Sequence, residues 1–333
     1  MEKNEKIYIA GDTGLVGSAL VRCLQKHGYL NLITKTGEEL DLLDSAAIAD
    51  FFRAEKPAYV FMVASKSGSI QANINYPAEF IYENLVIQNN IINNAYLNRV
   101  KKLLFFGASC VYPKTSPQPI KEEYLLTGEL ELTSKPYAVA KIAGITMCQA
   151  YNKQHGTKFI SVVPATLYGP NDYFDLEKSH VLSALLRKFY EAKINEQKEV
   201  VLWGTGTPRR EFIYVDDLAE AGIFIMNSNI GTSDVPNING NNRTSDVQNN
   251  FNFDLINIGT GTDLTIKELA EMIKRIFDFK GEIKWDTAKP DGAKQKLLDV
   301  SRLHLLGWRH RVELEEGIKI TYQWLKENYD KLS

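Results

Sequence analysis

The chain of 333 residues is long enough for one large domain, or one large and one small domain, and too short for three. Its 39 Lys and Arg residues nearly balance its 41 Asp and Glu residues, giving a formal net charge of −2. A general nucleic-acid-binding protein normally has a surplus of positive charge, so we expect no nucleic-acid partner. The hydrophobic content of 44% and charged content of 24% are typical of a soluble globular protein.

The cysteines and the N-terminus bear on the cellular compartment. Cys23, Cys110 and Cys148 are widely spaced and form no CxxC pair, which predicts neither a disulfide framework nor a zinc site. Residues 2–6 are polar, and no run approaches the roughly 18 apolar residues that span a bilayer. We therefore expect a cytoplasmic protein with no bound metal and no membrane partner.

Short β-branched runs alternate with longer helical patterns through the first half of the chain. Near-continuous apolar strands separated by helices indicate a parallel sheet covered on both faces. The prediction is therefore a doubly wound α/β domain. Its strands are expected at 7–10, 32–34, 59–63, 102–106 and 159–163, and its helices at 18–27, 45–55, 80–98 and 137–154.

The pattern is looser after residue 170. Helices are expected at 183–193, 216–227, 266–277 and 314–328, and strands at 199–203 and 254–258. The segment 229–252 is rich in Asn, Ser, Gly, Thr and Asp and poor in large apolar residues. Because such a segment cannot bury enough surface to offset its ordering entropy, we expect an exposed loop with a composition typical of disorder.

A glycine-rich turn, Gly11-Asp12-Thr13-Gly14-Leu15-Val16-Gly17, follows the first expected strand and opens the first helix. Glycines allow a tight turn and a close backbone approach, and the free N–H groups of a helix N-terminus can hold a pyrophosphate. Such turns also serve packing alone. The position of this one between strand and helix predicts a dinucleotide-binding site.

Tyr137 and Lys141 are four residues apart on an expected helix and therefore share a face. A lysine ammonium near a phenol favours the phenolate and lowers the phenol pKa. Taken alone, the two residues could be an ordinary surface pair. Together with a dinucleotide turn they predict proton exchange with an alcohol or carbonyl while a nicotinamide exchanges hydride.

With both motifs in place, the chain resembles the extended short-chain dehydrogenases/reductases and, among them, the GDP-L-fucose synthase family, which epimerises and reduces a GDP-4-keto-6-deoxy sugar. The resemblance covers nearly the whole chain apart from 229–252. The segments that support it are YPAEFIYEN (76–84), SCVYP (109–113), PYAVAKIAG (136–144), LYGP (167–170), SHV (179–181), WGTGTPRREF (203–212) and KPDG (289–292).

The resemblance implies a Rossmann fold with two parts. A dinucleotide-binding domain is expected at 1–170, with returning segments near 212–228 and 254–262. A smaller C-terminal α/β domain for the GDP-sugar is expected at 171–211 and 263–333. The family also implies a homodimer.

Roles for individual residues follow from the same resemblance. Tyr137 matches the proton donor to the C4 oxygen, and Lys141 the residue that tunes it and holds the nicotinamide ribose. Cys110 matches the base that removes a proton beside the C4 ketone, and His180 the acid that returns one. For Cys110 the alternative is a small buried packing residue, although its position just past a sheet strand favours the ligand crevice.

The resemblance implies two binding sets. Arginine suits a diphosphate by its planar fork, and tryptophan supplies a stacking surface. The adjacent Arg209 leaves the arginine assignment open by one position. Substrate binding is implied for Lys188, Trp203, Arg210 and Asp291, and cofactor binding for Gly11, Thr13, Gly14, Leu15, Val16, Gly17, Lys35, Asp41, Leu42, Ala64, Lys141, Pro164, Leu167 and His180.

Three features depart from the family pattern. Ala108 occupies the place of the catalytic serine, so the carbonyl is polarised by Tyr137 alone, by Ser109 after a local rearrangement, or by water. Thr13 and Gly37 replace basic residues near a 2′-phosphate, which leaves Lys35. No Asp or Glu ends the second strand to take a ribose 2′-hydroxyl. These features favour NADP(H) over NAD(H) only modestly.

The predicted function is reduction at C4 of a GDP-4-keto-6-deoxy hexose or heptose, with epimerisation at C3, C5 or both. One alternative is a C4 reductase without epimerase activity, against which the presence of both Cys110 and His180 argues. Another is a catalytically silent dinucleotide-binding scaffold, which Ala108 supports and the intact Tyr137–Lys141 pair opposes.

Overall fold

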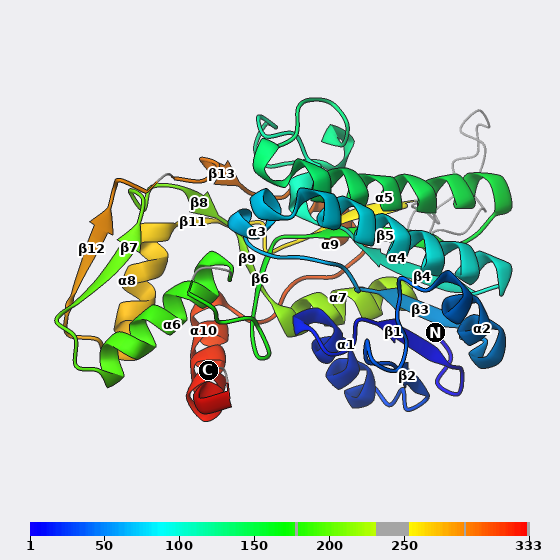
Figure 1. The fold of residues 1–333 in the computed structure, drawn as a ribbon, viewed down its shortest axis with the longest axis horizontal. Coiled ribbons are helices and arrows are strands. Elements are labelled where there is room, and N and C mark those ends of the chain that lie inside the picture. Colours follow the sequence, from blue (N-terminus) through cyan, green and yellow to red (C-terminus); the bar gives the residue numbers. More distant parts are fainter. Residues whose placement is uncertain (177–178, 231–252, 290, 332–333) are drawn as a thin grey trace.

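The computed structural model describes residues 1–176, 179–230, 253–289 and 291–331, and within them a six-stranded parallel sheet (Figure 1). The strand order is β10-β5-β4-β3-β1-β2. The chain changes direction across the sheet between β1 and β3, so their carboxyl ends border a crevice of the kind that binds ligands. The strands are β1 (Ile7–Ala10), β2 (Leu32–Thr34), β3 (Tyr59–Met62), β4 (Lys102–Phe106), β5 (Phe159–Pro164) and β10 (Leu255–Ile258).

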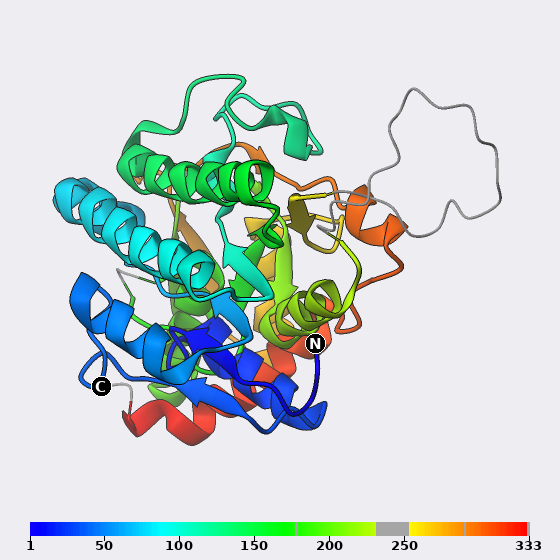
Figure 2. The ribbon, with the colours of Figure 1, turned by 90° about the vertical axis from the view of Figure 1, so that its right-hand side faces the viewer.

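Helices cover both faces of this sheet. One face carries α2 (Ser45–Glu55), α4 (Pro77–Leu97) and α5 (Lys135–His155), with α4 and α5 side by side in Figure 2. The other face carries α1 (Leu15–Lys26) packed on α7 (Val215–Asn227). Every residue of β1, β3, β4, β5 and β10 is buried, as expected for strands covered on two sides. The predicted doubly wound α/β fold is confirmed.

A second region packs around its own apolar core and lies opposite the sheet in Figure 1. Its helices are α6 (Val181–Ile194), α8 (Ile266–Phe277) and α10 (Leu314–Asn328), and β7 (Glu199–Trp203) pairs with β12 (Glu282–Asp286). Three shorter strands form a small sheet beside it: β8 (Arg209–Arg210), β11 (Leu264–Thr265) and β13 (Gln295–Lys296). A parallel pair, β6 (Thr166–Tyr168) and β9 (Phe212–Tyr214), lies between the two regions in Figure 1.

Most predicted elements are present with bounds within a few residues. The helix expected from residue 18 begins at Leu15, because Gly14 is already its N-cap. The helices α3 (Ile70–Asn75) and α9 (Ser301–Leu305), the two-residue strands, β6, β9 and β12 were not predicted. Of the segment expected to be an exposed loop, Ile230 is buried, and residues 231–252 lie outside the described residues. Within the described chain, none of the helices combines the length and apolar character needed to cross a membrane.

Candidate active site

The glycine turn after β1 packs against the end of β3. Gly11 has a φ of +93°, and a Cβ there would lie 2.8 Å from the backbone of Ala64, whose N–H donates to Ala10 over 2.7 Å. A Cβ at Gly17 would overlap the carbonyl of Gly11. By contrast, a Cβ at Gly14 would meet only one atom, at 3.9 Å, and α1 has no side-chain cap. The N-terminus of α1 therefore has room beside Gly14 and no side chain capping its N–H groups, which fits a pyrophosphate.

The other residues predicted to bind the cofactor follow the carboxyl ends of neighbouring strands. Thr13, Leu15 and Val16 lie in the turn and the first turn of α1. Lys35 follows β2, and its Nζ lies 3.4 Å from Glu39 Oε1. Because the carboxyl ends of parallel strands share one edge of the sheet, these positions border the same crevice. Asp41 and Leu42 follow β2, Ala64 follows β3, Pro164 ends β5 and Leu167 lies in β6.

Tyr137 and Lys141 lie on the first turns of α5, with the lysine Nζ 5.9 Å from the centre of the tyrosine ring. Lys141 is buried and donates to the carbonyl oxygen of Phe106 over 2.9 Å. Burial lowers the pKa of Lys141 to about 8. It raises the pKa of Tyr137, so the lowering expected from the nearby lysine does not dominate here.

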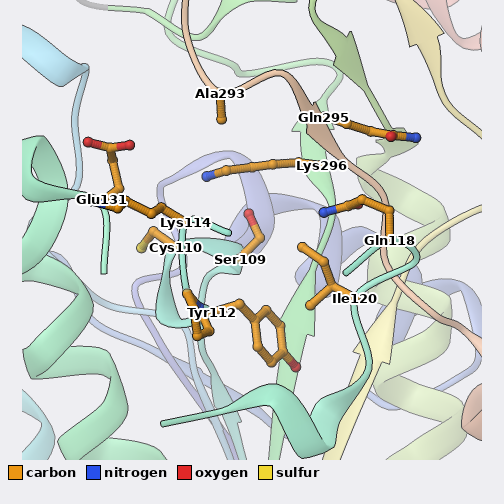
Figure 3. A pocket seen from close by; sticks show the side chains of 11 residues that line it. Ser109, Cys110, Tyr112, Lys114, Gln118, Ile120, Glu131, Ala293, Gln295 and Lys296 are labelled. Atoms are coloured by element: carbon orange, nitrogen blue, oxygen red, sulfur yellow. The ribbon is translucent and has the colours of Figure 1, made fainter. Parts of the chain in front are cut away.

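Cys110 lies in the short helix η1 (Ser109–Val111), which begins two residues past the end of β4, and it lines a pocket together with Ser109 and Lys296 (Figure 3). The Lys296 side chain extends across this pocket in Figure 3. Burial raises the pKa of the Cys110 thiol, and the cations of Lys296 and Lys141 oppose that rise. Cys110 in turn interacts with Tyr137. The structure thus brings Tyr137, Lys141, Cys110 and Ser109 into one neighbourhood.

Lys296 was not predicted. It belongs to β13, is partly buried, and interacts with both Cys110 and Arg210. It therefore connects the residues around Cys110 with those predicted to bind the substrate. A lysine between Gln295 and Leu297 has no motif of its own, and only the pairing of β13 with β8 brings it to the site.

Trp203 and two lysines form an exposed group at the end of β7. The Trp203 side chain is 53% exposed, and the Nζ atoms of Lys188 and Lys289 lie 5.3 and 5.2 Å from its ring. Lys188 also donates to the carbonyl of Val201 over 3.1 Å. An aromatic face flanked by two cations is suited to an anionic ligand with a flat ring, such as a nucleoside diphosphate. Lys289 was not among the predicted residues.

The structure distinguishes Arg210 from Arg209. Arg209 donates from Nε to Asp263 over 2.9 Å, so its guanidinium is already bound to a carboxylate of the protein. Arg210 donates to the carbonyl of Ala293 over 2.6 Å and interacts with Asp291, and burial lowers its pKa. Asp291 accepts from the backbone and hydroxyl of Thr205. Arg210 is therefore the arginine that lies with Asp291 and Lys296.

His180 lies apart from this group. It precedes α6 as its N-cap, is exposed, and interacts with Asp172. Among the described contacts, none joins His180 to Cys110 or Tyr137. Its part in the reaction stays a prediction.

The hydroxyl of Ser65 was also missed. Ser65 follows β3, and its hydroxyl favours a lower pKa for the Tyr137 phenol, although burial raises that pKa overall. A polar residue just past a buried strand was the available signal.

Comparisons with known proteins agree with this geometry. The model of the NAD dependent epimerase/dehydratase family matches residues 7–238. GDP-L-fucose synthase 1 of Arabidopsis thaliana is 51% identical over 327 residues, which cover 98% of this chain and 95% of that protein.

Two solved structures from Campylobacter jejuni are also similar. A GDP-D-glycero-L-gluco-heptose synthase in the presence of NADPH has a TM-score of 0.84 and 43% identity, covering 98% of this chain and 99% of that one. A GDP-mannoheptose C4 reductase with NADP bound has a TM-score of 0.84 and 45% identity, again covering 98% and 99%. The chain therefore belongs to the NAD dependent epimerase/dehydratase family and is a GDP-L-fucose synthase-like member of it.

Proposed function

We propose that this protein is an NADP(H)-dependent enzyme that reduces C4 of a GDP-4-keto-6-deoxy sugar and epimerises C3, C5 or both. The observation that supports it most is the grouping of Tyr137, Lys141 and Cys110 in a fold that also has a dinucleotide turn. Lys296 interacts with both Cys110 and Arg210, and so connects this group with the proposed substrate site. The names of its relatives support the same substrate class, as a hexose or a heptose.

In the proposed reduction, Tyr137 gives its proton to the C4 oxygen. Lys141, held by the Phe106 carbonyl, binds the nicotinamide ribose. When bound, the reduced nicotinamide supplies the hydride to C4. The turn from Gly11 to Gly17 holds its pyrophosphate.

In the proposed epimerisation, Cys110 removes a proton from the carbon beside the C4 ketone, which the carbonyl has made acidic. The Lys296 and Lys141 cations favour the thiolate that this step requires. His180 returns a proton on the opposite face of the ring. For this it must approach the sugar from the N-terminus of α6.

We infer a preference for NADP(H) from two observations. A similar synthase was solved in the presence of NADPH, and a similar reductase with NADP bound. Lys35 is a cation after β2, where a 2′-phosphate would lie, although it also forms an ion pair with Glu39. NAD(H) remains the alternative cofactor.

We propose that 171–211 and 263–333 form the GDP-sugar domain, because they contain Lys188, Trp203, Arg210 and Asp291. Residues 1–170, with 212–228 and 254–262, then form the dinucleotide-binding domain. The two separate apolar cores favour this division. Three free cysteines suit a reducing cytoplasm.

Exposed apolar side chains on the outer faces of α4 and α5 favour a homodimer through these helices. Tyr82 is 65% exposed and Val139 37% exposed. Light scattering on the purified protein tests the stoichiometry, and Tyr82→Glu is expected to give monomers.

The test of the activity is oxidation of NADPH, followed by its absorbance, with a panel of GDP-4-keto hexoses and heptoses. Products formed in deuterated water are then analysed by mass spectrometry and NMR. The proposal predicts reduction at C4 with deuterium at C3, C5 or both. Reduction without deuterium would indicate the reductase alternative, and no oxidation with any sugar would indicate the silent scaffold.

Cys110→Ser separates the two reactions. We expect deuterium incorporation to fall about 10²-fold or more, the scale of one lost general base, while direct C4 reduction partly persists. His180→Asn should instead allow exchange at one carbon while inversion fails. Exchange and inversion at the parent rate in the serine variant would identify Cys110 as a packing residue.

A further inference from the structure

His180 lies on a helix that belongs to the second apolar core, whereas the other proposed catalytic residues belong to the sheet region. It is the N-cap of α6, which buries Leu182 and Leu186 in that second core (Figure 1). Cys110 follows β4, and Tyr137 lies on α5, which covers the sheet. The chain that joins the two regions before α6 therefore determines where His180 lies relative to the other two.

Two adjacent side chains between β6 and α6, those of Asn171 and Asp172, make this connection. We propose that Asp172 is a positioning residue for His180. Its carboxylate fixes the first turn of α6 to a segment that Asn171 holds against α1, and so sets the place from which His180 returns a proton to the sugar. The inference rests on the proposed role of His180 in epimerisation.

Asp172 is buried, and both of its carboxylate oxygens accept hydrogen bonds. Oδ2 accepts from the hydroxyl of Ser183, which is also buried and lies in the first turn of α6. Oδ1 accepts the N–H of Tyr173 over 2.8 Å. In the same turn of helix, Ala184 donates its N–H to the carbonyl of His180 over 3.0 Å. By holding Ser183, the carboxylate therefore also fixes the backbone of His180.

Asn171 attaches the same segment to the helix that opens the dinucleotide site. It has a φ of +65°, and its Nδ2 donates to Ser18 Oγ over 3.2 Å. Ser18 donates its N–H to the carbonyl of Gly14, in the dinucleotide turn, over 2.9 Å. A Cβ at Gly169 would lie 2.5 Å from the side chain of Val215, at the start of α7. The segment is thus held against both α1 and α7.

The charge of Asp172 suits the same role. Burial raises the pKa of its carboxyl, and the Ser183 hydroxyl, the Tyr173 N–H and the charge of His180 oppose that rise. An anion at this place attracts a protonated imidazole, which is the form of histidine that can return a proton. It also lies near the positive end of the α6 dipole.

The test measures deuterium exchange and inversion separately, in deuterated water, on a GDP-4-keto sugar that the parent epimerises. Asp172→Ala, and the milder Ser183→Ala, should each lower inversion about 10- to 100-fold, the scale of a misplaced catalytic group. Exchange by Cys110, C4 reduction and NADPH affinity should stay near the parent values. Ser179→Ala is the matched control, because its hydroxyl donates to the carbonyl of Asp175 and not to Asp172.

Two further measurements separate positioning from a general structural role. Adding Asp172→Ala to His180→Asn should leave the exchange and C4 reduction of the single variant unchanged, because Asp172 acts through His180. Amide hydrogen exchange in the first turn of α6, followed by mass spectrometry without substrate, should be faster in Asp172→Ala than in the parent.

The inference is overturned if Asp172→Ala inverts the sugar at the parent rate or leaves amide exchange in α6 unchanged. A loss of inversion in Ser179→Ala as large as that in Ser183→Ala would also contradict it, as would a further loss of exchange or reduction in the double variant. A parent that forms no epimerised product, or a His180→Asn variant that inverts normally, would overturn the proposed function instead. Amide exchange would then still decide whether Asp172 fixes α6.

Discussion

Tyr137 is the residue on which the proposed reduction depends most directly. We expect Tyr137→Phe to lower kcat about 10²- to 10⁴-fold, because it removes one general acid. The phenyl ring keeps the edge-on contact with Phe80, so the fold and the affinity for NADPH should be nearly unchanged. Steady-state kinetics and fluorescence titration of NADPH check both expectations. Near-normal reduction by the variant would show that another group protonates C4.

Arg210 and Arg209 offer a matched pair at the substrate end of the site. Arg210→Lys should raise KM for the GDP-sugar about tenfold or more, because a lysine loses the planar fork that binds two phosphate oxygens. Arg209→Lys changes a side chain engaged by Asp263 and should leave KM close to the parent value. Equal effects of the two substitutions would contradict the assignment of Arg210.

The residues that the sequence could identify lie in contiguous motifs. Tyr137 and Lys141 are four residues apart on one helix, so their spacing was enough to predict the pair. Cys110 was identified by the resemblance to the family and by its place past a strand. Lys296 and Lys289 reach the site through β13 and the segment before it, far along the chain from Cys110 and Trp203. No local pattern marks such residues, and only tertiary structure brings them in.

At the scale of elements, the link between β3 and α4 depends on Asn84. Its side chain is buried and bonds both backbone groups of Lys66 and the carbonyl of Phe80. Asn84→Ala should lower the free energy of unfolding by about 1–3 kcal/mol, because it leaves the partly buried backbone N–H and C=O of Lys66 unpaired.

The matched control is Asn89→Ala on the exposed face of the same helix, expected to change stability by no more than about 0.5 kcal/mol. Urea unfolding is measured for both variants. Equal stability of the two would mean that Asn84 does not fix the segment after β3.

The elements that were predicted are those whose periodicity persists over many residues. The sheet strands are apolar runs buried on both faces, and α8 has an apolar stripe and a capping box of Thr265 and Glu268. β8, β11 and β13 are two residues long, and each pairs with a segment distant in sequence. Strands so short have no detectable alternation, which is why they were missed.

At the scale of the whole molecule, the buried carboxylate of Glu211 joins segments from distant parts of the chain. Glu211 lies between β8 and β9 and accepts N–H groups from Thr260 and Gly261 over 2.7 Å and from Leu298 over 2.9 Å. Despite these donors, burial raises its pKa from 4.5 to about 7. The native protein therefore holds a proton on Glu211 over a pH range in which the unfolded chain has lost it.

This raised pKa predicts a pH dependence of stability. A group with a raised native pKa contributes stability that is fully present below the unfolded value and is lost as pH rises through the native value. Between pH 4.5 and about 7 the parent should lose about 3 kcal/mol from this group, at 1.36 kcal/mol per pKa unit.

In the Glu211→Gln variant, the side chain at 211 cannot titrate. Between roughly pH 4.5 and 7 the parent should therefore lose about 3 kcal/mol of unfolding free energy relative to the variant. Urea unfolding of both proteins across that range measures it, and all other titrating groups cancel in the comparison. Parallel curves would mean that the three N–H donors offset the cost of burial, so that Glu211 has the same pKa in the native protein and in the unfolded chain.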